Sequence, residues 1–229
     1  TVSVPVSVVV DHSSDFRIDD QGMLVSYLGH SVDVTIPDGV RAIGQSAFVR
    51  QDDTVPVRHL RIPASVTTIE REAFHDFPLG AVTFEDDEKN PSKLVTIGDR
   101  AFAGTDLESI DLPRSVTTIG EGAFAQNKSL TTLRLGAKVV GSSLVSVVES
   151  TPALTRIEVN PANTSLESVD GVLYQMNPRR LIALPAAKEP GGGYTVLAGT
   201  TSIAAGAAVD ARIAAVTLPD SLQEIGDRA

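Results

Sequence analysis

A nine-residue phrase recurs four times along the chain, and this recurrence constrains the fold more than any other feature of the sequence. The phrase has an Ile in its fourth position and ends in Ala-Phe, and its copies end at Phe48, Phe74, Phe102 and Phe124. The steps between these Phe residues are 26, 28 and 22 residues. Such a period is typical of repeat architectures, in which one unit cannot bury its own apolar face and must stack on the next. The sequence therefore predicts a solenoid.

A short strand-like phrase precedes each copy and usually ends in Pro. Residues 34–37, 60–63, 110–113 and 216–219 have the Pro, and residues 82–84, 133–135 and 157–159 fill the same position without it. Apolar and polar residues alternate in these phrases, as in a half-buried β-strand, and Pro cannot donate a further ladder bond. We expect one short parallel strand per repeat. A short helical or 3₁₀ turn and an irregular return should follow it, with the Ala-Phe pair pointing inward.

Small departures from the repeat predict where the stack changes. Residues 137–148 align poorly with the phrase, and in residues 203–208 an Ala replaces the final Phe. Residues 19–24 and 169–174 each place a turn-forming Gly before an apolar strand, which favours one or two inserted β-hairpins.

The domain organisation follows from the extent of the repeats. We expect residues 1–15 to be a linker or an edge strand, and residues 16–229 to form a single solenoid domain. The last copy of the phrase stops at Ala229, one residue before its Phe position. We therefore expect a domain truncated at its C-terminal end, cut from a longer protein.

Charge and composition exclude several classes of partner. Nineteen basic and 29 acidic residues give a net charge of −10, which repels phosphate backbones and anionic membranes, so we expect no nucleic acid partner. The absence of Cys excludes disulfides and thiolate metal sites. No apolar run approaches the roughly 20 residues that span a bilayer, so we expect no membrane insertion. The alternating residues 1–10 lack the basic lead of a signal peptide.

No constellation of side chains indicates catalysis, so we expect no catalytic, cofactor-binding or metal-binding residue and no enzyme activity. The histidines are His12, His30, His59 and His75, and no two have the spacing of metal ligands. The acidic residues 85–88 could bind Ca²⁺, but they lack the alternating spacing and central Gly of a dedicated loop, which favours a solvated loop. Asn127 and Asn163 begin glycosylation tripeptides, a pattern that also arises often by chance.

What remains is the exposed face of the strands, where every second side chain points outward. As ligand-binding residues this selects Asp33, Thr35, His59, Arg61, Ala81, Thr83, Ser109, Asp111, Thr132, Arg134, Arg156 and Glu158. The mixture of charges and small hydroxyls suits a polar, extended protein or glycan. The alternative is a solvated sheet face without a ligand, since the row has no aromatic anchor of the kind that dominates tight interfaces.

The stretch from Leu107 to Phe124 resembles the BspA-like leucine-rich repeats, because a strand, a Pro, Val-Thr-Thr-Ile-Gly and Ala-Phe follow in that order. The resemblance covers about residues 16–229 and is strongest over residues 34–135. The family occurs mainly in bacterial surface and secreted proteins and in some parasitic protists. The resemblance implies a right-handed, β-rich horseshoe of the α/β type or a gently curved stack.

For function, the resemblance implies a secreted or cell-surface bacterial protein that takes part in adhesion by binding a host or matrix protein or a glycan. The signal and the anchor would lie outside this fragment. The family has no catalytic residues to carry over and no cofactor. The alternative is a structural spacer, or an accessory repeat domain of a larger surface protein or enzyme.

Overall fold

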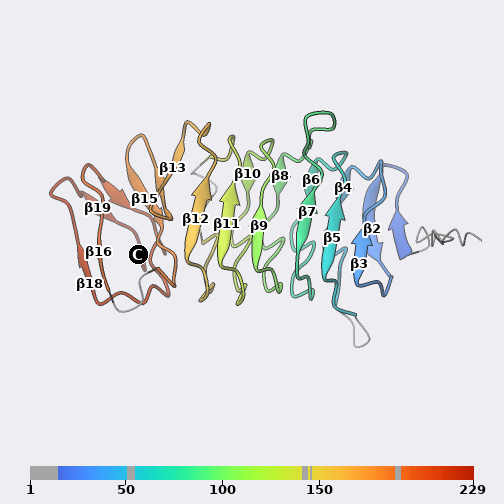
Figure 1. Cartoon of the computed structure of the whole chain (residues 1–229), viewed down its shortest axis with the longest axis horizontal. Coiled ribbons are helices and arrows are strands. Elements are labelled where there is room, and N and C mark those ends of the chain that lie inside the picture. Colours follow the sequence, from blue (N-terminus) through green and yellow to red (C-terminus); the bar gives the residue numbers. More distant parts are fainter. Residues whose placement is uncertain (1–14, 51–54, 141–143, 145, 189–191) are drawn as a thin grey trace, which may run out of the picture.

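The chain forms a β-solenoid of stacked coils. A computed structural model describes residues 15–50, 55–140, 144, 146–188 and 192–229. The expected linker at residues 1–15 thus lies outside the described residues, apart from Asp15. Figure 1 shows the coils side by side along the long axis of the molecule. The described residues contain no helix that could cross a membrane.

The predicted strands line one side of the stack, here called the strand face. They are β3 (Asp33–Thr35), β5 (His59–Ile62) and β7 (Val82–Phe84) in one parallel sheet, and β9 (Ser109–Asp111), β11 (Thr132–Leu135) and β12 (Arg156–Val159) in the next. In each sheet equivalent residues of successive repeats are in register, as with Leu60 opposite Val34 and Leu133 opposite Ile110. The predicted strand of each repeat is confirmed.

Each of the four regular coils also has a second, shorter strand, which the sequence did not lead us to expect. The strands β4 (Ala42–Ile43), β6 (Thr68–Ile69), β8 (Thr96–Ile97) and β10 (Thr118–Ile119) pair in parallel on the other side of the stack. They are the middle of the recurring phrase, and all four Ile side chains are fully buried. This second sheet gives each coil two walls that enclose the core.

The expectation of helical or 3₁₀ returns is wrong for the described coils, where the returns are turns held by the next coil. The N–H of Phe74 donates to the carbonyl of Ala101 (2.8 Å), and the N–H of Phe102 donates to that of Ala123 (2.9 Å). A helix would need these N–H groups for its own carbonyls four residues back. Left-handed residues, such as Glu72 with φ of 56°, further interrupt any helical path.

An aromatic column runs through the core. The rings of Tyr27, Phe48, Phe74, Phe102 and Phe124 follow one another with centroids 4.9, 4.6, 4.9 and 5.7 Å apart. The four Phe side chains are at most 1% exposed, which confirms that the Ala-Phe pair points inward. Tyr27 occupies the Phe position of the first coil, because its N–H donates to Ala47 (2.8 Å) as the later Phe residues donate to their neighbours.

Both predicted hairpins are present. β1 (Phe16–Ile18) pairs antiparallel with β2 (Met23–Tyr27), which joins the short-strand sheet. β13 (Leu166–Val169) and β14 (Val172–Gln175) form the second hairpin around Asp170 and Gly171, both with positive φ as a type I′ turn requires. β14 also pairs antiparallel with β15 (Arg180–Ala183).

The irregular C-terminal repeats continue the stack. β17 (Ser202–Ile203) and β19 (Glu224–Ile225) extend the sheet of β15, and β16 (Gly193–Thr195) pairs with β18 (Ala215–Thr217). The described end of the poorly aligned repeat stacks on the fourth coil, where the N–H of Phe124 donates to Val147 (3.0 Å) as it would to a regular neighbour. Val148 therefore stands in the Phe position there.

Candidate functional site

The strand face brings the residues selected from the sequence into two rows. One row holds Thr35, Arg61 and Thr83 in register, with Asp33 and His59 beside it on β3 and β5. The second sheet places Ser109, Thr132 and Arg156 in one row and Asp111, Arg134 and Glu158 in the other. Most of these side chains are exposed, so the predicted orientation is confirmed for them.

Thr132 departs from that pattern. It is only 9% exposed, whereas its neighbours in register, Ser109 and Arg156, are exposed. The alternation of the strand predicted that Thr132 is exposed. Alternation fixes the direction of a side chain, but it does not predict whether neighbouring residues cover that side chain. Thr132 is therefore a poor contact for a ligand.

The charges of the second sheet form a ladder across three strands. The Arg134 guanidinium donates from Nη1 to Asp111 Oδ1 and from Nε to Glu158 Oε2, both at 2.7 Å. The hydrogen bond to Asp111, then that to Glu158, together with the charges of both carboxylates, raises the pKa of Arg134 above its ordinary value. Arg156 is held less tightly, with Nη1 3.5 Å from Glu158 Oε1.

The first sheet also pairs its cation. Arg61 Nε donates to Glu85 Oε1 (2.7 Å), and His59 Nε2 lies 2.7 Å from the Thr83 hydroxyl. A ligand that uses Arg61 must compete with Glu85. Of the three arginines predicted on this face, Arg156 therefore has the longest ion pair, which a ligand can replace most easily.

The acidic loop after β7 uses its carboxylates internally. Asp86 accepts hydrogen bonds from the N–H of Ser92 (3.1 Å) and of Arg114 (3.2 Å), and Asp87 accepts from the N–H of Lys89 and Asn90 (both 2.8 Å). These bonds hold the loop and tie it to a neighbouring coil. In the described part of the chain, no group of three or more His, Cys, Asp or Glu could hold a metal ion.

A groove closes the C-terminal end of the strand face. This end groove has a volume of about 410 Å³ and is lined by Thr155, Arg156, Glu158, Asp170, Gly171, Ala187 and Lys188. The turn of the second hairpin packs against β12 here, because a Cβ at Gly171 would lie only 2.8 Å from the Cβ of Arg156. Lys188 is held by Asp170 at 2.6 Å. Lys188 was not predicted from the sequence. The signal that could have pointed to this groove is the Asp170-Gly171 turn, which forms one of its sides.

The two glycosylation tripeptides begin with buried asparagines. Asn127 donates from Nδ2 to the carbonyls of Phe102 (2.8 Å) and Phe124 (2.9 Å), and its Oδ1 accepts from the Thr105 hydroxyl (2.5 Å). Asn163 donates to the carbonyl of Val139 (3.0 Å). Both amides link neighbouring parts of the stack, so they are not open to a glycan.

The parallel strands, buried Ile and Phe positions and stacked coils define a leucine-rich-repeat solenoid. The family described as BspA type Leucine rich repeat region matches in six copies, over residues 27–139 and 52–169. These matches cover more than half of the chain, which therefore belongs to the BspA-type leucine-rich-repeat family.

Solved structures of bacterial leucine-rich-repeat proteins share the fold. One from Eubacterium ventriosum superposes with a TM-score of 0.73 at 22% identity, over 90% of this chain and 55% of that one. The pneumococcal vaccine antigen PcpA gives 0.62 at 23% identity, over 90% of this chain and 60% of that one. The leucine-rich-repeat protein of T. pallidum gives 0.54 at 19% identity, over 93% and 84%.

These likenesses are below 25% identity and show the fold alone. The chain spans little more than half the length of the first two structures. No curated protein matches the sequence.

Proposed function

We propose that the chain is a non-catalytic binding segment of a secreted or cell-surface bacterial protein, and that its strand face contacts a host or matrix protein or a glycan. The observation that carries this proposal is the pair of polar rows that runs over two parallel sheets and ends in the end groove. Membership of the BspA-type family and the likeness to a pneumococcal vaccine antigen support a surface setting.

The end groove is the part of this face best suited to anchor a ligand. Within the described part of the chain, the ion pair of Arg156 is a 3.5 Å contact to Glu158, which also binds Arg134 at 2.7 Å. Arginine offers five N–H donors and binds carboxylates or sulfates in a bidentate fashion. An extended partner would place an acidic group at Arg156 and run along the rows toward β3.

A matched pair of charge reversals tests this proposal. The chain is screened against an array of extracellular matrix proteins and glycans, and each hit is titrated with Arg156→Glu and with Lys138→Glu. Lys138 is exposed and lies outside the strand face, so it controls for net charge. We expect Arg156→Glu to weaken the hit about tenfold or more at an unchanged melting temperature, and Lys138→Glu to leave it unchanged.

Two outcomes would overturn the assignment. Equal affinities of Arg156→Glu and the parent chain would remove the strand face as the contact. An array without hits would favour the second candidate described next.

The second candidate is a structural spacer, or an accessory repeat domain of a larger surface protein or enzyme. It is favoured by the way the strand face satisfies its own charges, as Arg61 does with Glu85 and Arg134 does with Asp111 and Glu158. A spacer predicts that deleting whole coils shortens the parent protein without changing what the parent binds.

A further inference from the structure

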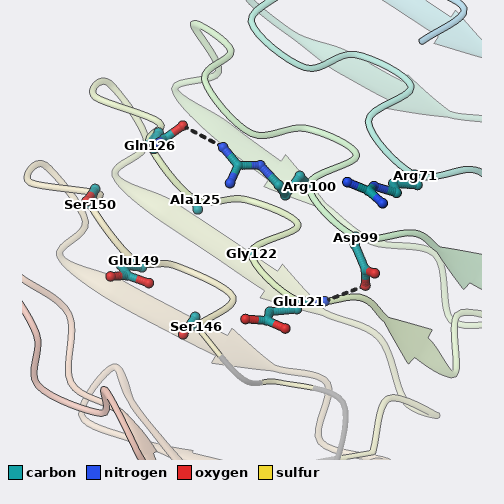
Figure 2. A pocket seen from close by; sticks show the side chains of 10 residues that line it. All are labelled: Arg71, Asp99, Arg100, Glu121, Gly122, Ala125, Gln126, Ser146, Glu149 and Ser150. Carbon is teal, nitrogen blue, oxygen red and sulfur yellow. Dashed lines mark hydrogen bonds between the residues drawn. The ribbon is translucent and has the colours of Figure 1, made fainter. Parts of the chain in front are cut away.

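A second groove lies away from the strand face, on the turns that lead from each short strand to the next coil. We name these turns the turn face. The groove has a volume of about 450 Å³, which is within the range of small-molecule sites. Figure 2 shows its floor at Gly122 and Ala125, with Arg100 on one side and Glu121 and Glu149 on the other.

The groove lies over the fourth coil, which carries small lining residues, Gly122 and Ala125, at two turn positions where other coils carry larger ones. The position after the Phe is Val49 and His75 in the first two coils, but Ala103 and Ala125 in the next two. The left-handed position two residues before the Phe is Glu72 and Arg100 in the second and third coils, but Gly122 in the fourth. The groove therefore lies over the fourth coil.

The backbone under the groove keeps the regular hydrogen bonds between coils. The N–H groups of Arg100 and Gly104 donate to the carbonyls of Glu121 and Ala125, both at 2.9 Å, and Gln126 donates to Glu149 at 2.8 Å. The hollow is therefore made by the choice of side chains alone, on a floor that needs no rearrangement to receive a ligand.

One wall presents an arginine without an acidic partner. The Arg100 guanidinium lies 3.1 Å from His75 Nε2 and 3.3 Å from Gln126 Oε1, and it takes part in no ion pair with the described residues. Its neighbour Arg71, by contrast, pairs with Glu72 at 3.1 Å. Arg100 is thus available for an anionic group in a protein whose net charge is −10.

The opposite wall presents oxygen atoms. Figure 2 shows the Glu121 carboxylate and the Ser146 side chain on this side, and Ser150 at the end of the groove beyond Glu149. Glu149 is held by Arg228 at 3.0 Å, whereas the Glu121 side chain has no hydrogen-bonding partner within the ranges that the structure describes. Carboxylate and hydroxyl groups of this kind bind hydroxyl groups of a ligand.

The ligand chemistry follows from these two walls. The lining has no aromatic side chain and little that could pack an apolar group. It has one available guanidinium and several hydroxyl-binding oxygens over a floor of glycine and alanine. We propose that this groove on the turn face binds a carboxylated sugar unit of a glycan. The sugar carboxylate is bound by Arg100, and the ring hydroxyls donate to Glu121 and contact Ser146 and Ser150.

Paired glycans test the proposal and distinguish the two common sources of a carboxylated sugar. Multivalent displays of sialyllactose and of a glucuronic-acid disaccharide are compared with lactose and with the matching glucose disaccharide. We expect one acidic display to bind at least about tenfold more tightly than its neutral counterpart, since a bidentate charged pair contributes that much.

Variants then locate the site. Arg100→Gln should remove the preference for the acid, and Gln suits this left-handed backbone because Gln126 adopts φ of 61° in the next coil. Ala125→Leu should block the groove without harm to the fold, since the equivalent positions hold Val49, His75 and Glu149. Arg156→Gln, on the strand face, should change nothing, which separates this site from the one proposed above.

The proposal is overturned by equal binding of the acidic and neutral displays, or by acid-selective binding that survives both Arg100→Gln and Ala125→Leu. A peptide with one Asp and one Lys can be tested as a competitor of the bound display. If the peptide displaces the display at concentrations where the free acidic glycan does not, the proposal is also overturned and the groove is assigned to a peptide.

Discussion

Phe102 shows how much a single residue of the repeat contributes to the stability of the solenoid. It is fully buried, and its ring stacks between Phe74 at 4.9 Å and Phe124 at 5.7 Å. Phe102→Ala should lower the free energy of unfolding by about 3–5 kcal/mol, because it removes a buried ring and leaves a cavity between two others. Urea denaturation followed by circular dichroism measures the change.

The control for this change is Ser109→Ala on the exposed strand face, which should stay within about 0.5 kcal/mol of the parent chain. Thr132 is unsuitable as a control because it is only 9% exposed. A loss of equal size at both positions would contradict the inward and outward assignments.

Single residues differ in how far the sequence predicts them. The Phe positions are predictable because their spacing repeats and because a large apolar side chain gains most from burial. The role of Asn127 is not predictable, since one of its partners, the backbone carbonyl of Phe102, lies on the preceding coil. The groove residue Lys188 is missed for a similar reason, as its position depends on a hairpin turn 18 residues earlier.

At the scale of the element, the glycines of the turns have two distinct roles. Gly120 follows the buried Ile119 without a positive φ, and a Cβ there would overlap the backbone of Gly98 and Asp99 in the preceding coil. Gly122 has φ of 60°, but a Cβ there would lie 3.6 Å from its nearest neighbours. The first glycine permits close approach, whereas the second occupies a turn position that Ser46, Glu72 and Arg100 also adopt.

Two substitutions separate these roles. Gly120→Ala should cost about 1–3 kcal/mol, because the coils must move apart to admit the methyl group. Gly122→Ala should cost about 1 kcal/mol, the strain of a left-handed Ala whose methyl group meets its neighbours at an ordinary contact distance. Thermal unfolding of both variants shows which substitution lowers stability more. A larger loss for Gly122→Ala would mean that backbone strain, and not coil spacing, limits the turn.

Elements were predictable where their signal lies within a few neighbouring residues. The strand phrases alternate in polarity and the Asp170-Gly171 turn has a residue pair typical of hairpins, so both elements are predictable. The second strands, such as Thr68–Ile69, are only two residues long and leave no periodic signal. Local sequence does not distinguish these turns from short helices, because the partners of their N–H groups lie one coil away, as for Phe74 and Ala101.

For the whole molecule, the core is continuous but its filling changes along the axis. Regular coils place an aromatic ring in the column, whereas the later coils place Val148 and then Ala208 at the equivalent position. Leu184 also stands in this series, since its N–H donates to Ala207 (2.7 Å) as each Phe donates to the next coil. A solenoid is stabilised coil by coil through contacts with nearest neighbours, so a weakly filled coil lowers stability locally.

Ala208 marks the place where this filling can be improved. It borders an apolar hollow of about 200 Å³ whose lining includes Leu184, Val196 and Ile203. Ala208→Leu should stabilise these coils by about 0.5–2 kcal/mol, because the added side chain fills space beside the existing core. Hydrogen exchange at the Ala204 amide, which donates to Leu181 (2.8 Å), should slow accordingly. Ala205→Leu, at an exposed position of the same turn, controls for added hydrophobicity and should leave that rate unchanged. Faster exchange in Ala208→Leu would mean that the hollow cannot accept a side chain from this position, so that the series of core positions from Phe124 to Ala208 is not one packing axis.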